Sequence, residues 1–248
     1  MKRAEEVFAR FPHDWLFLKD ALARSAGNLF ASPLEIPETH LLRNEVRQIS
    51  FIAGRCDSGF AADAASLLQT GKWGPCVSLP SDDWRESLAK LGDLFYIGDS
   101  MITFTGLAPA AGGSLEGREA VRLEGKHAGQ ITLRGWPSAS TFVQSSIGFG
   151  IVADGQVLSY AISNFPMSDA MEVAVWTSPE HRRRGLAFKS ASALLNFCRN
   201  KDIEAHWTSW SGNVAACSLA RKLGFAEEHP HDWAFVNPKS VKGSATRP

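Results

Sequence analysis

The second half of the chain places short apolar runs between turn signals in a regular order. Apolar and β-branched residues predict strands over Ile147–Ala153, Gln156–Phe165 and Met171–Thr177. The Asp154-Gly155 pair between the first two runs is typical of a type I′ hairpin, so we expect antiparallel strands here. The spacing of apolar residues in Leu186–Asn200 then predicts a helix. A strand, a helix and a last strand are predicted at Ile203–Ser209, Asn213–Leu223 and Trp233–Val236.

The first half mixes helical and strand patterns. Helical spacing predicts helices at Asp14–Ala26 and Phe60–Leu68, and a third helix that follows Ser81 as its N-cap and contains Trp84 and Leu88. Four β-rich runs lie between or after these segments: Ile49–Ala53, Cys76–Leu79, Phe95–Ile97 and Met101–Phe104. This half is therefore expected to form an α/β unit, and the whole chain a mixed α/β (α+β) fold.

A segment poor in large side chains separates the two halves. Leu107–Gly117 is rich in Gly, Ala and Pro and is typical of a linker or a long surface loop. Lys239–Pro248 lacks apolar periodicity and is typical of a frayed end. We therefore predict an N-terminal α/β domain over 1–118, a second domain over 119–239 and a flexible tail over 240–248.

Composition narrows the class of protein. The 248 residues carry 26 basic and 26 acidic side chains and are 44% hydrophobic, which is typical of a globular chain and excludes wholesale disorder. Zero formal net charge argues against a nucleic-acid partner, since non-specific affinity for a polyanion needs an excess of Lys and Arg. No apolar run reaches the ~18–20 residues that span a bilayer, so no membrane association is expected.

The N-terminus and the cysteines indicate a compartment. Met1–Phe8 contains acidic residues where a signal peptide would need an apolar run, so we expect a cytoplasmic protein. The four Cys show no C-x-x-C spacing and no paired His nearby, so neither a zinc site nor a redox dithiol is predicted. We expect reduced and mostly buried thiols.

One segment carries candidate chemistry, the run from Glu172 to Ala187. A strand leads into a short loop that opens directly into a helix, so that backbone N–H groups and the helix dipole point at one place and can bind an anion. Gly185 lets the backbone approach a ligand, and Arg182, Arg183 and Arg184 add positive charge. Without a G-K-[ST] sequence to supply a Mg²⁺ ligand, this loop suits a pyrophosphate better than a metal-bound triphosphate. A solvated basic helix start is the alternative interpretation.

Two ordered motifs resemble a known superfamily. Arg182-x-x-Gly185-x-Ala187, directly after a strand, resembles the acyl-CoA-binding signature of the GCN5-related N-acetyltransferases (GNAT). The run from Asn213 to Phe225, an Asn-led helix that closes on Leu-Gly-Phe, resembles the second signature of the same superfamily. The spacing of residues from Glu172 to Ala187 is most similar to the zwittermicin-resistance-type acetyltransferases. The resemblance covers about residues 140–237.

The resemblance implies a set of binding residues. In this superfamily the pantetheine arm of acetyl-CoA lies along a strand end, here Val175, Trp176 and Thr177, and Asn213 reaches the pantetheine or the acyl end. The pyrophosphate would lie on the loop and first helical turn, which comprise Arg182, Arg183, Arg184, Gly185, Leu186 and Ala187. A backbone N–H near Ala174 or Val175 would stabilise the oxyanion. Acetyl-CoA would be the cofactor and CoA a product.

The resemblance also implies an acid–base group, and here the chain departs from the pattern. Glu172 is our candidate base; a strand-edge Glu that is paired with an Arg or faces solvent is the alternative. The commoner position of this acid matches Met171, and a shift of one residue reverses the face of a strand unless a β-bulge restores it. The Tyr that protonates the leaving thiolate in many relatives corresponds to Ala220, so no residue is assigned as the acid. Water could protonate the thiolate, and Cys217, which shares the Asn213 face of the helix, is more simply interpreted as a small buried thiol.

Several His and Trp residues have two interpretations. His181 could contact a phosphate or face solvent, and His206, Trp207 and Trp210 could border the acceptor pocket or pack the core. Trp73, Trp84 and Trp136 could line a cleft between the two halves. His229 and His231 flank Pro230, which predicts a turn before the last strand.

These observations predict an acetyl-CoA-dependent N-acetyltransferase, an acyltransferase that acts on a primary amine of a small molecule. The N-terminal half would shape the acceptor site. A catalytically silent acyl-CoA-binding module and a protein or peptide N-acetyltransferase are the alternatives. The sequence leaves the oligomeric state open and is compatible with a homodimer.

Overall fold

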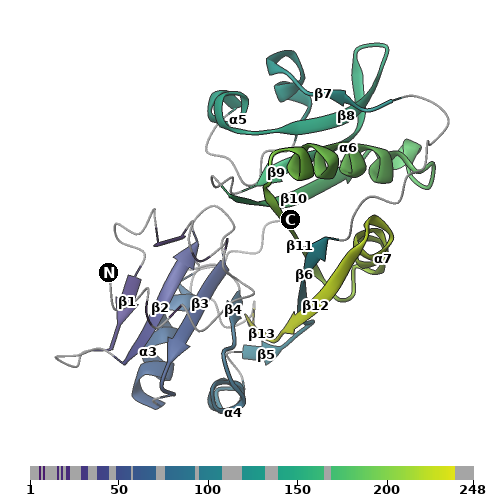
Figure 1. The fold of residues 1–248 in the computed structure, drawn as a ribbon. Coiled ribbons are helices and arrows are strands. Elements are labelled where there is room, and N and C mark those ends of the chain that lie inside the picture. The colour runs from purple at the N-terminus through teal and green to yellow at the C-terminus, as the bar shows by residue number, and fades with distance from the viewer. Residues whose placement is uncertain are drawn as a thin grey trace, which may run out of the picture. The chain divides into compact units, whose positions relative to one another are not determined.

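The computed structural model describes two compact units. The described residues are 6, 8, 16, 18, 21–22, 29–32, 38–44, 49–56, 58–70, 76–92, 95–107, 119–131, 139–164 and 169–237. One unit comprises Met1–Met101 with Pro230–Pro248, and the other comprises Ile102–His229. Their described strands form a six-stranded and a seven-stranded sheet, each combined with helices (Figure 1). The predicted mixed α/β class is therefore confirmed.

The first sheet has the order β1-β2-β3-β4-β13-β5. Its strands are β1 (Leu29–Ala31), β2 (Thr39–Asn44), β3 (Ile49–Gly54), β4 (Cys76–Ser78), β5 (Phe95–Ile97) and β13 (Trp233–Val236). Strand β13 comes from the far end of the chain and pairs antiparallel with both β4 and β5. The first unit therefore contains residues from both ends of the described chain.

This unit contains the helices α3 (Ser58–Gln69) and α4 (Asp82–Ala89). Trp84 of α4 is fully buried in the core of the unit, and its Nε1 donates a hydrogen bond to the carbonyl oxygen of Gly54 at 3.1 Å. The expectation that Trp84 lines a cleft is therefore wrong, because the apolar face of α4 carries this ring into the core. Trp73 and Trp136 lie outside the described residues.

The second sheet has the order β12-β6-β11-β10-β9-β8-β7. Its strands are β6 (Met101–Leu107), β7 (Val121–Arg122), β8 (Gly148–Ala153), β9 (Gln156–Asn164), β10 (Ala170–Thr177), β11 (Glu204–Trp210) and β12 (Phe225–His231). Strands β8, β9 and β10 form the predicted antiparallel series. Asp154 and Gly155 have φ values of 51° and 77°, as the predicted type I′ turn requires.

Helix α6 (Leu186–Asn200) lies across β8, β9 and β10 and has the predicted bounds (Figure 1). Together with α7 (Val214–Leu223) it packs over one face of the sheet, where Leu194, Ala220 and Phe104 belong to one core cluster. The opposite face of β8–β10 packs a second cluster with η2 (Gly125–Gln130) and α5 (Ala139–Ser145). The two faces thus have separate cores.

The structure corrects one predicted turn. His229, Pro230 and His231 belong to strand β12, not to a turn before the last strand. Strand β12 is at the edge of the second sheet. An edge strand tolerates proline because one side of its backbone needs no hydrogen-bonding partner strand.

Other predicted features fall partly or wholly outside the described residues. Of the helix predicted at Asp14–Ala26, the described residues are Leu16, Leu18, Ala21 and Leu22; all four are helical and buried. Residues 108–118 and the tail from residue 238 are not described, so the predicted boundaries at 118 and 239 stay predictions. None of the described helices has the length and apolar character that a bilayer crossing needs.

Buried thiols make the fold sensitive to alkaline pH. Burial raises the pKa of Cys76 to about 12 and that of Cys198 to about 11. In the unfolded chain both thiols ionise above pH ~8.5, while the native state keeps their protons. The contribution of these protonated thiols to the free energy of unfolding is therefore fully present below pH ~8.5. It falls as the pH rises, by about 1–2 kcal/mol per thiol between pH 8 and 10.

Urea unfolding of the wild type, Cys76→Ala and Cys198→Ala at pH 8 and pH 10 measures this effect. Each variant should lose less stability than the wild type between the two pH values. An equal loss in all three proteins would contradict the assignment.

Candidate functional site

Strand β10 has two different edges. Its pairing with β9 runs from Glu172 to Thr177 without interruption. Its parallel pairing with β11 covers only Ala170–Glu172 against Glu204–His206. From Val173 to Thr177, the β11-side edge of β10 therefore has no strand partner among the described residues. Its backbone groups are available to an extended ligand, which could add as a strand.

The predicted pantetheine residues lie on this open edge. Val175, Trp176 and Thr177 form the last part of β10, and all three are half-buried. The Thr177 hydroxyl is within hydrogen-bond distance of the Ser159 hydroxyl, at 2.8 Å, and the Trp176 ring stacks on Tyr160 with 5.5 Å between centroids. These side-chain contacts on β9 hold the strand while its other edge stays open.

The side chains of β10 alternate regularly between the two faces of the sheet. Met171, Val173 and Val175 pack in the core beneath α6, whereas Ala174 and Trp176 pack in the cluster on the opposite face. Glu172 therefore lies on the face opposite α6. The register with β9 shows no shift, so the bulge considered as a way to reorient this residue is absent from the β9–β10 pairing. A register shift does occur in the neighbouring pair of strands, β8 and β9, between Ile151 and Val152.

Glu172 lies among other buried polar residues. Its side chain is 4% exposed, and by strand register it lies between Asn164 of β9 and His206 of β11, which are also buried. Glu172 and His206 are the last paired residues before β10 and β11 separate. We call this point the fork. The alternative of a solvent-facing Glu172 is excluded by its burial.

The loop after β10 has an unusual backbone. It passes through η3 (Pro179–His181) and then places Arg183 and Gly185 at φ values of 61° and 74°. The three arginines are exposed, and the Nε atom of Arg182 donates a hydrogen bond to the carbonyl oxygen of Thr177 at 3.2 Å. The His181 Nδ1 atom lies 2.8 Å from the Ser178 hydroxyl, which fixes its ring within the loop.

The start of α6 can hold an anion. Gly185 is its N-cap and provides no side-chain cap, and the first backbone hydrogen bond runs from the Lys189 N–H to the Gly185 carbonyl at 3.1 Å. The N–H groups of Leu186, Ala187 and Phe188 are therefore left without intrahelical acceptors. A Cβ atom at Gly185 would meet no described atom within 4 Å, so there is room above the backbone. The residues present fit the phosphate groups of CoA.

Asn213 lies at the start of the second helix of the motif. It is the N-cap of α7, and its Oδ1 atom accepts a hydrogen bond from the Ala216 N–H at 3.2 Å. The side-chain oxygen thus has a structural role, and the amide nitrogen is the group that can donate to a ligand. On the same helix, Ala220 is fully buried in the core, and Cys217 contacts the carbonyl oxygen of Trp210 through its Sγ at 3.5 Å.

The other residues predicted to border the acceptor pocket lie on different faces of the sheet. Trp207 packs in the core with Phe225, their ring centroids 6.3 Å apart, so its core interpretation holds. His206 lies on the opposite face, beside Glu172. Sequence reasoning missed this proximity and that of Asn164, because the register of a parallel pair joins residues distant in the chain. Within the described residues, no group of three or more His, Cys, Asp or Glu side chains is placed to hold a metal ion.

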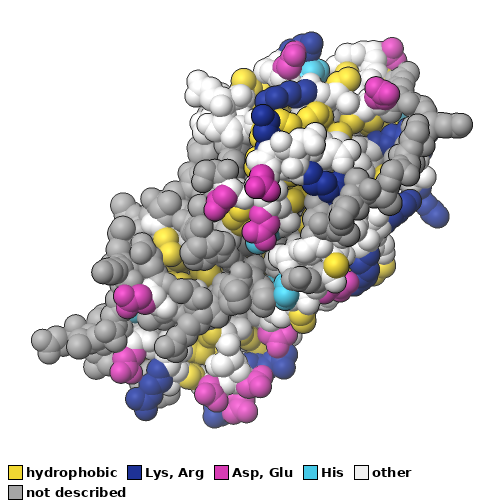
Figure 2. Space-filling view, viewed as in Figure 1, with side chains coloured by type: hydrophobic (Ala, Val, Ile, Leu, Met, Phe, Trp, Pro, Cys, Tyr) yellow, Lys and Arg dark blue, Asp and Glu magenta, His cyan; other side chains and the backbone are white. Residues whose placement is uncertain are grey.

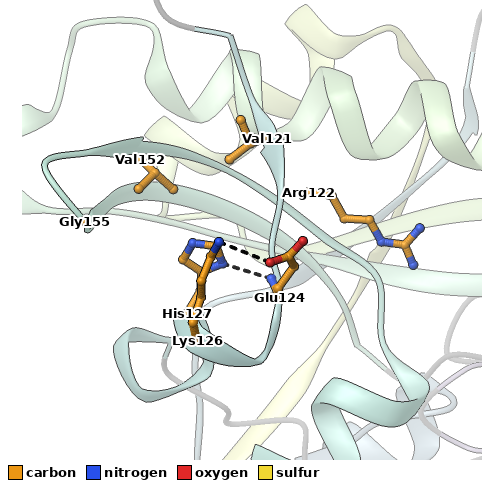
Figure 3. Close-up of a pocket in the computed structure, with 7 residues that line it drawn as sticks. All are labelled: Val121, Arg122, Glu124, Lys126, His127, Val152 and Gly155. Atoms are coloured by element: carbon orange, nitrogen blue, oxygen red, sulfur yellow. Dashed lines mark hydrogen bonds and ion pairs between the residues drawn. The ribbon is translucent and has the colours of Figure 1, made fainter.

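A separate hollow of about 600 Å³ lies near the β7 edge of the same unit. Figure 3 shows that Lys126 and His127 point toward Glu124, whereas Arg122 points away from them. The hollow is lined by Val121, Arg122, Glu124, Lys126, His127, Val152 and Gly155, and thus by none of the predicted site residues. Among the described residues on the face shown in Figure 2, Lys and Arg side chains are scattered among acidic ones and form no single large patch.

Part of this chain is similar to known acetyltransferases. Residues 126–233 match the sequence model of the family described as GNAT acetyltransferase. The uncharacterized N-acetyltransferase YdfB of Bacillus subtilis (strain 168) is 32% identical over 90 residues, which are 36% of this chain and 34% of that protein. This chain thus spans about a third of the length of that curated relative.

Two solved structures share the fold. A GCN5-related N-acetyltransferase-like protein from Streptococcus suis 89/1591 has a TM-score of 0.74 at 18% identity, over 95% of this chain and 98% of its own. The GCN5-related N-acetyltransferase from Kribbella flavida has a TM-score of 0.58 at 16% identity, over 90% and 93% of the two chains. Residues 126–233 therefore match the GNAT acetyltransferase family model, and the predicted GNAT fold is confirmed.

The capping role of Asn213 can be measured. Replacing Asn213 with Ala removes the hydrogen bond to the Ala216 N–H and should lower the free energy of unfolding by about 1 kcal/mol. Asn213→Asp is the matched control and should retain wild-type stability, because Asp caps helices as well as Asn does. Urea unfolding measures both variants. Equal destabilisation by Ala and Asp would contradict a capping role.

Proposed function

We propose that this chain is an acetyl-CoA-dependent N-acetyltransferase that transfers an acetyl group to a primary amine of a small molecule. The observation that carries the proposal is the uncapped start of α6 at the end of the open edge of β10. The GNAT family match of residues 126–233 supports it. Acetyl-CoA supplies an acetyl group activated as a thioester.

The binding residues follow from this arrangement. The backbone N–H groups from Arg182 to Ala187 bind the pyrophosphate, helped by the exposed Arg183 and Arg184 and by the helix dipole. Backbone groups of Val175–Thr177 pair with the pantetheine arm, and Asn213 donates through its amide nitrogen. A backbone N–H near Ala174 or Val175 stabilises the oxyanion.

Glu172 takes the proton from the acceptor ammonium, directly or through water. A protonated amine has no lone pair for attack, so a base must act before the C–N bond forms. The burial of Glu172 at the fork, one residue before the open edge begins, supports this role. Juxtaposition of amine and thioester supplies much of the remaining acceleration.

Water protonates the leaving thiolate in this proposal. The position of the tyrosine in many relatives is Ala220, a buried residue without a hydroxyl. A thiol with a pKa of ~8.5 is a good leaving group, so a dedicated acid is not needed. We also propose that the chain belongs to the zwittermicin-resistance-type branch, on the spacing from Glu172 to Ala187.

Isothermal titration with acetyl-CoA tests the binding proposal. Gly185→Glu places a carboxylate where the phosphates bind and should weaken acetyl-CoA binding by about tenfold or more, a change of about 1.4 kcal/mol. Gly155→Glu is the matched control, since Gly155 also has a positive φ, 77° against 74°, and open space around a built Cβ. Equal affinity of the two variants, or no binding by the wild type, would refute the proposed site.

Thiol release with a panel of small amines and lysine peptides tests the reaction. Glu172→Gln removes the base and should lower kcat by about 10²-fold near neutral pH, with acetyl-CoA affinity unchanged. A rate that stays at the wild-type value across pH 6–9 would exclude Glu172 as the base. Turnover of peptides but not small amines would identify a protein acetyltransferase, and binding without turnover would identify a silent module.

A further inference from the structure

A second buried titratable side chain lies beside Glu172. His206 is the β11 residue paired with Glu172 in the parallel register, and its side chain is 8% exposed. Neighbouring β11 residues Ala205 and Trp207 belong to the core beneath α6, so His206 points to the other face, as Glu172 does. Directly paired residues on one face of a sheet have adjacent side chains.

One ring nitrogen of His206 has a specific environment. Its Nε2 atom is buried and, among the described residues, has no hydrogen-bond partner of good geometry. It lies 3.0 Å from Oε1 of Glu204, close enough for an ion pair when the ring is protonated. The carboxylate is thus near the ring nitrogen but out of line with its N–H. A buried, incompletely bonded imidazole is unfavourable for stability alone and is typical of a functional site.

Glu204 connects this pair to solvent. It is two residues before His206 on β11, and its side chain is 64% exposed. Strand register places Glu172 next to His206, and the 3.0 Å distance places His206 next to Glu204, so the three residues follow one another from the buried fork toward solvent. A base as buried as Glu172 needs such a path, because the proton that it takes in each turnover must leave before the next.

The other polar groups near this face have their own partners. Thr103 of β6 lies 3.5 Å from Thr208 of β11, and His229 of β12 lies 3.0 Å from the Thr105 hydroxyl. On η2, which packs against β9, Lys126 pairs with Glu124, and His127 accepts a hydrogen bond from the Glu124 N–H. Asn164 of β9 is polar but does not titrate. Among the described titratable groups, Glu172 and Glu204 are therefore those placed to act on His206.

We propose that His206 is a proton-relay residue that carries the proton taken by Glu172 to Glu204 and solvent, an inference that rests on the proposed acetyl transfer. The acceptor ammonium gives one proton to the Glu172 carboxylate. His206 accepts it on Nδ1, releases a proton from Nε2 to Glu204, and regains its first tautomer by exchange with water. The amine then forms the C–N bond as the C–S bond breaks, and its second proton ends on the thiol.

NMR of the His206 ring at one fixed pH tests the coupling without any turnover. The relay places Glu172 and Glu204 next to the ring, so Glu172→Gln and Glu204→Gln should each change the chemical shifts of the ring nitrogens. The His206→Gln spectrum assigns the resonances. Ring resonances that neither variant moves would overturn the relay, whatever the activity of the protein.

Kinetics separate a relay from a structural role. His206→Gln should lower kcat by about 10²-fold, with KM for acetyl-CoA unchanged and the loss greatest at low pH, where hydroxide cannot replace the relay. The matched control is His229→Gln, the same change in a histidine outside the relay, which should retain the wild-type rate. A normal kcat in His206→Gln, or a loss equal at every pH, would overturn the proposal. Failure of the proposed function differs from both results, because the wild type itself would then neither bind acetyl-CoA nor turn over.

Discussion

The separation of β10 and β11 after Glu172 and His206 is the constraint on which the candidate site depends. Had the two strands stayed paired, the backbone groups of Val173–Thr177 would be bonded to β11 and closed to a ligand. Because they separate, one edge of β10 opens while β9 still holds the other. The loop at the end of this edge then leads into the uncapped start of α6. Strand edge, phosphate-binding turn and buried carboxylate therefore follow from one feature of strand pairing.

The anion site depends on backbone conformation as well as on charge. The sequence presents three consecutive arginines as equivalent, but the structure distinguishes them. The Nε of Arg182 is bonded to Thr177, so this residue also fastens the loop to the strand. Arg183 takes a left-handed conformation that is unfavourable for a side chain with a Cβ, and Gly185 takes a similar one without that cost. The strain at Arg183 is consistent with a loop shaped for binding.

Local signals in the sequence predict the turns and helices well. Strand pairings between residues that are distant in the chain cannot be predicted from such signals. The Asp154-Gly155 turn and the Leu186–Asn200 helix are encoded by neighbouring residues, and both were predicted correctly. Pro230 was interpreted as a turn because nothing nearby reveals that its strand lies at a sheet edge. The Arg182–Ala187 segment was found because one motif contains it. The sequence does not place His206 beside Glu172, because their proximity depends on the pairing of two strands that are distant in the chain.

The position of β13 has a consequence for how this protein is made. Two strands of the first sheet, β4 and β5, are joined through β13, whose residues Trp233–Val236 follow the entire second unit in the chain. A ribosome therefore releases most of the first unit long before the strand that bridges it exists. Until then β4 and β5 have open edges toward the missing strand, a state in which nascent chains are prone to mispairing. The N-terminal unit is thus synthesised first but completed last, after the whole of the second unit has been translated.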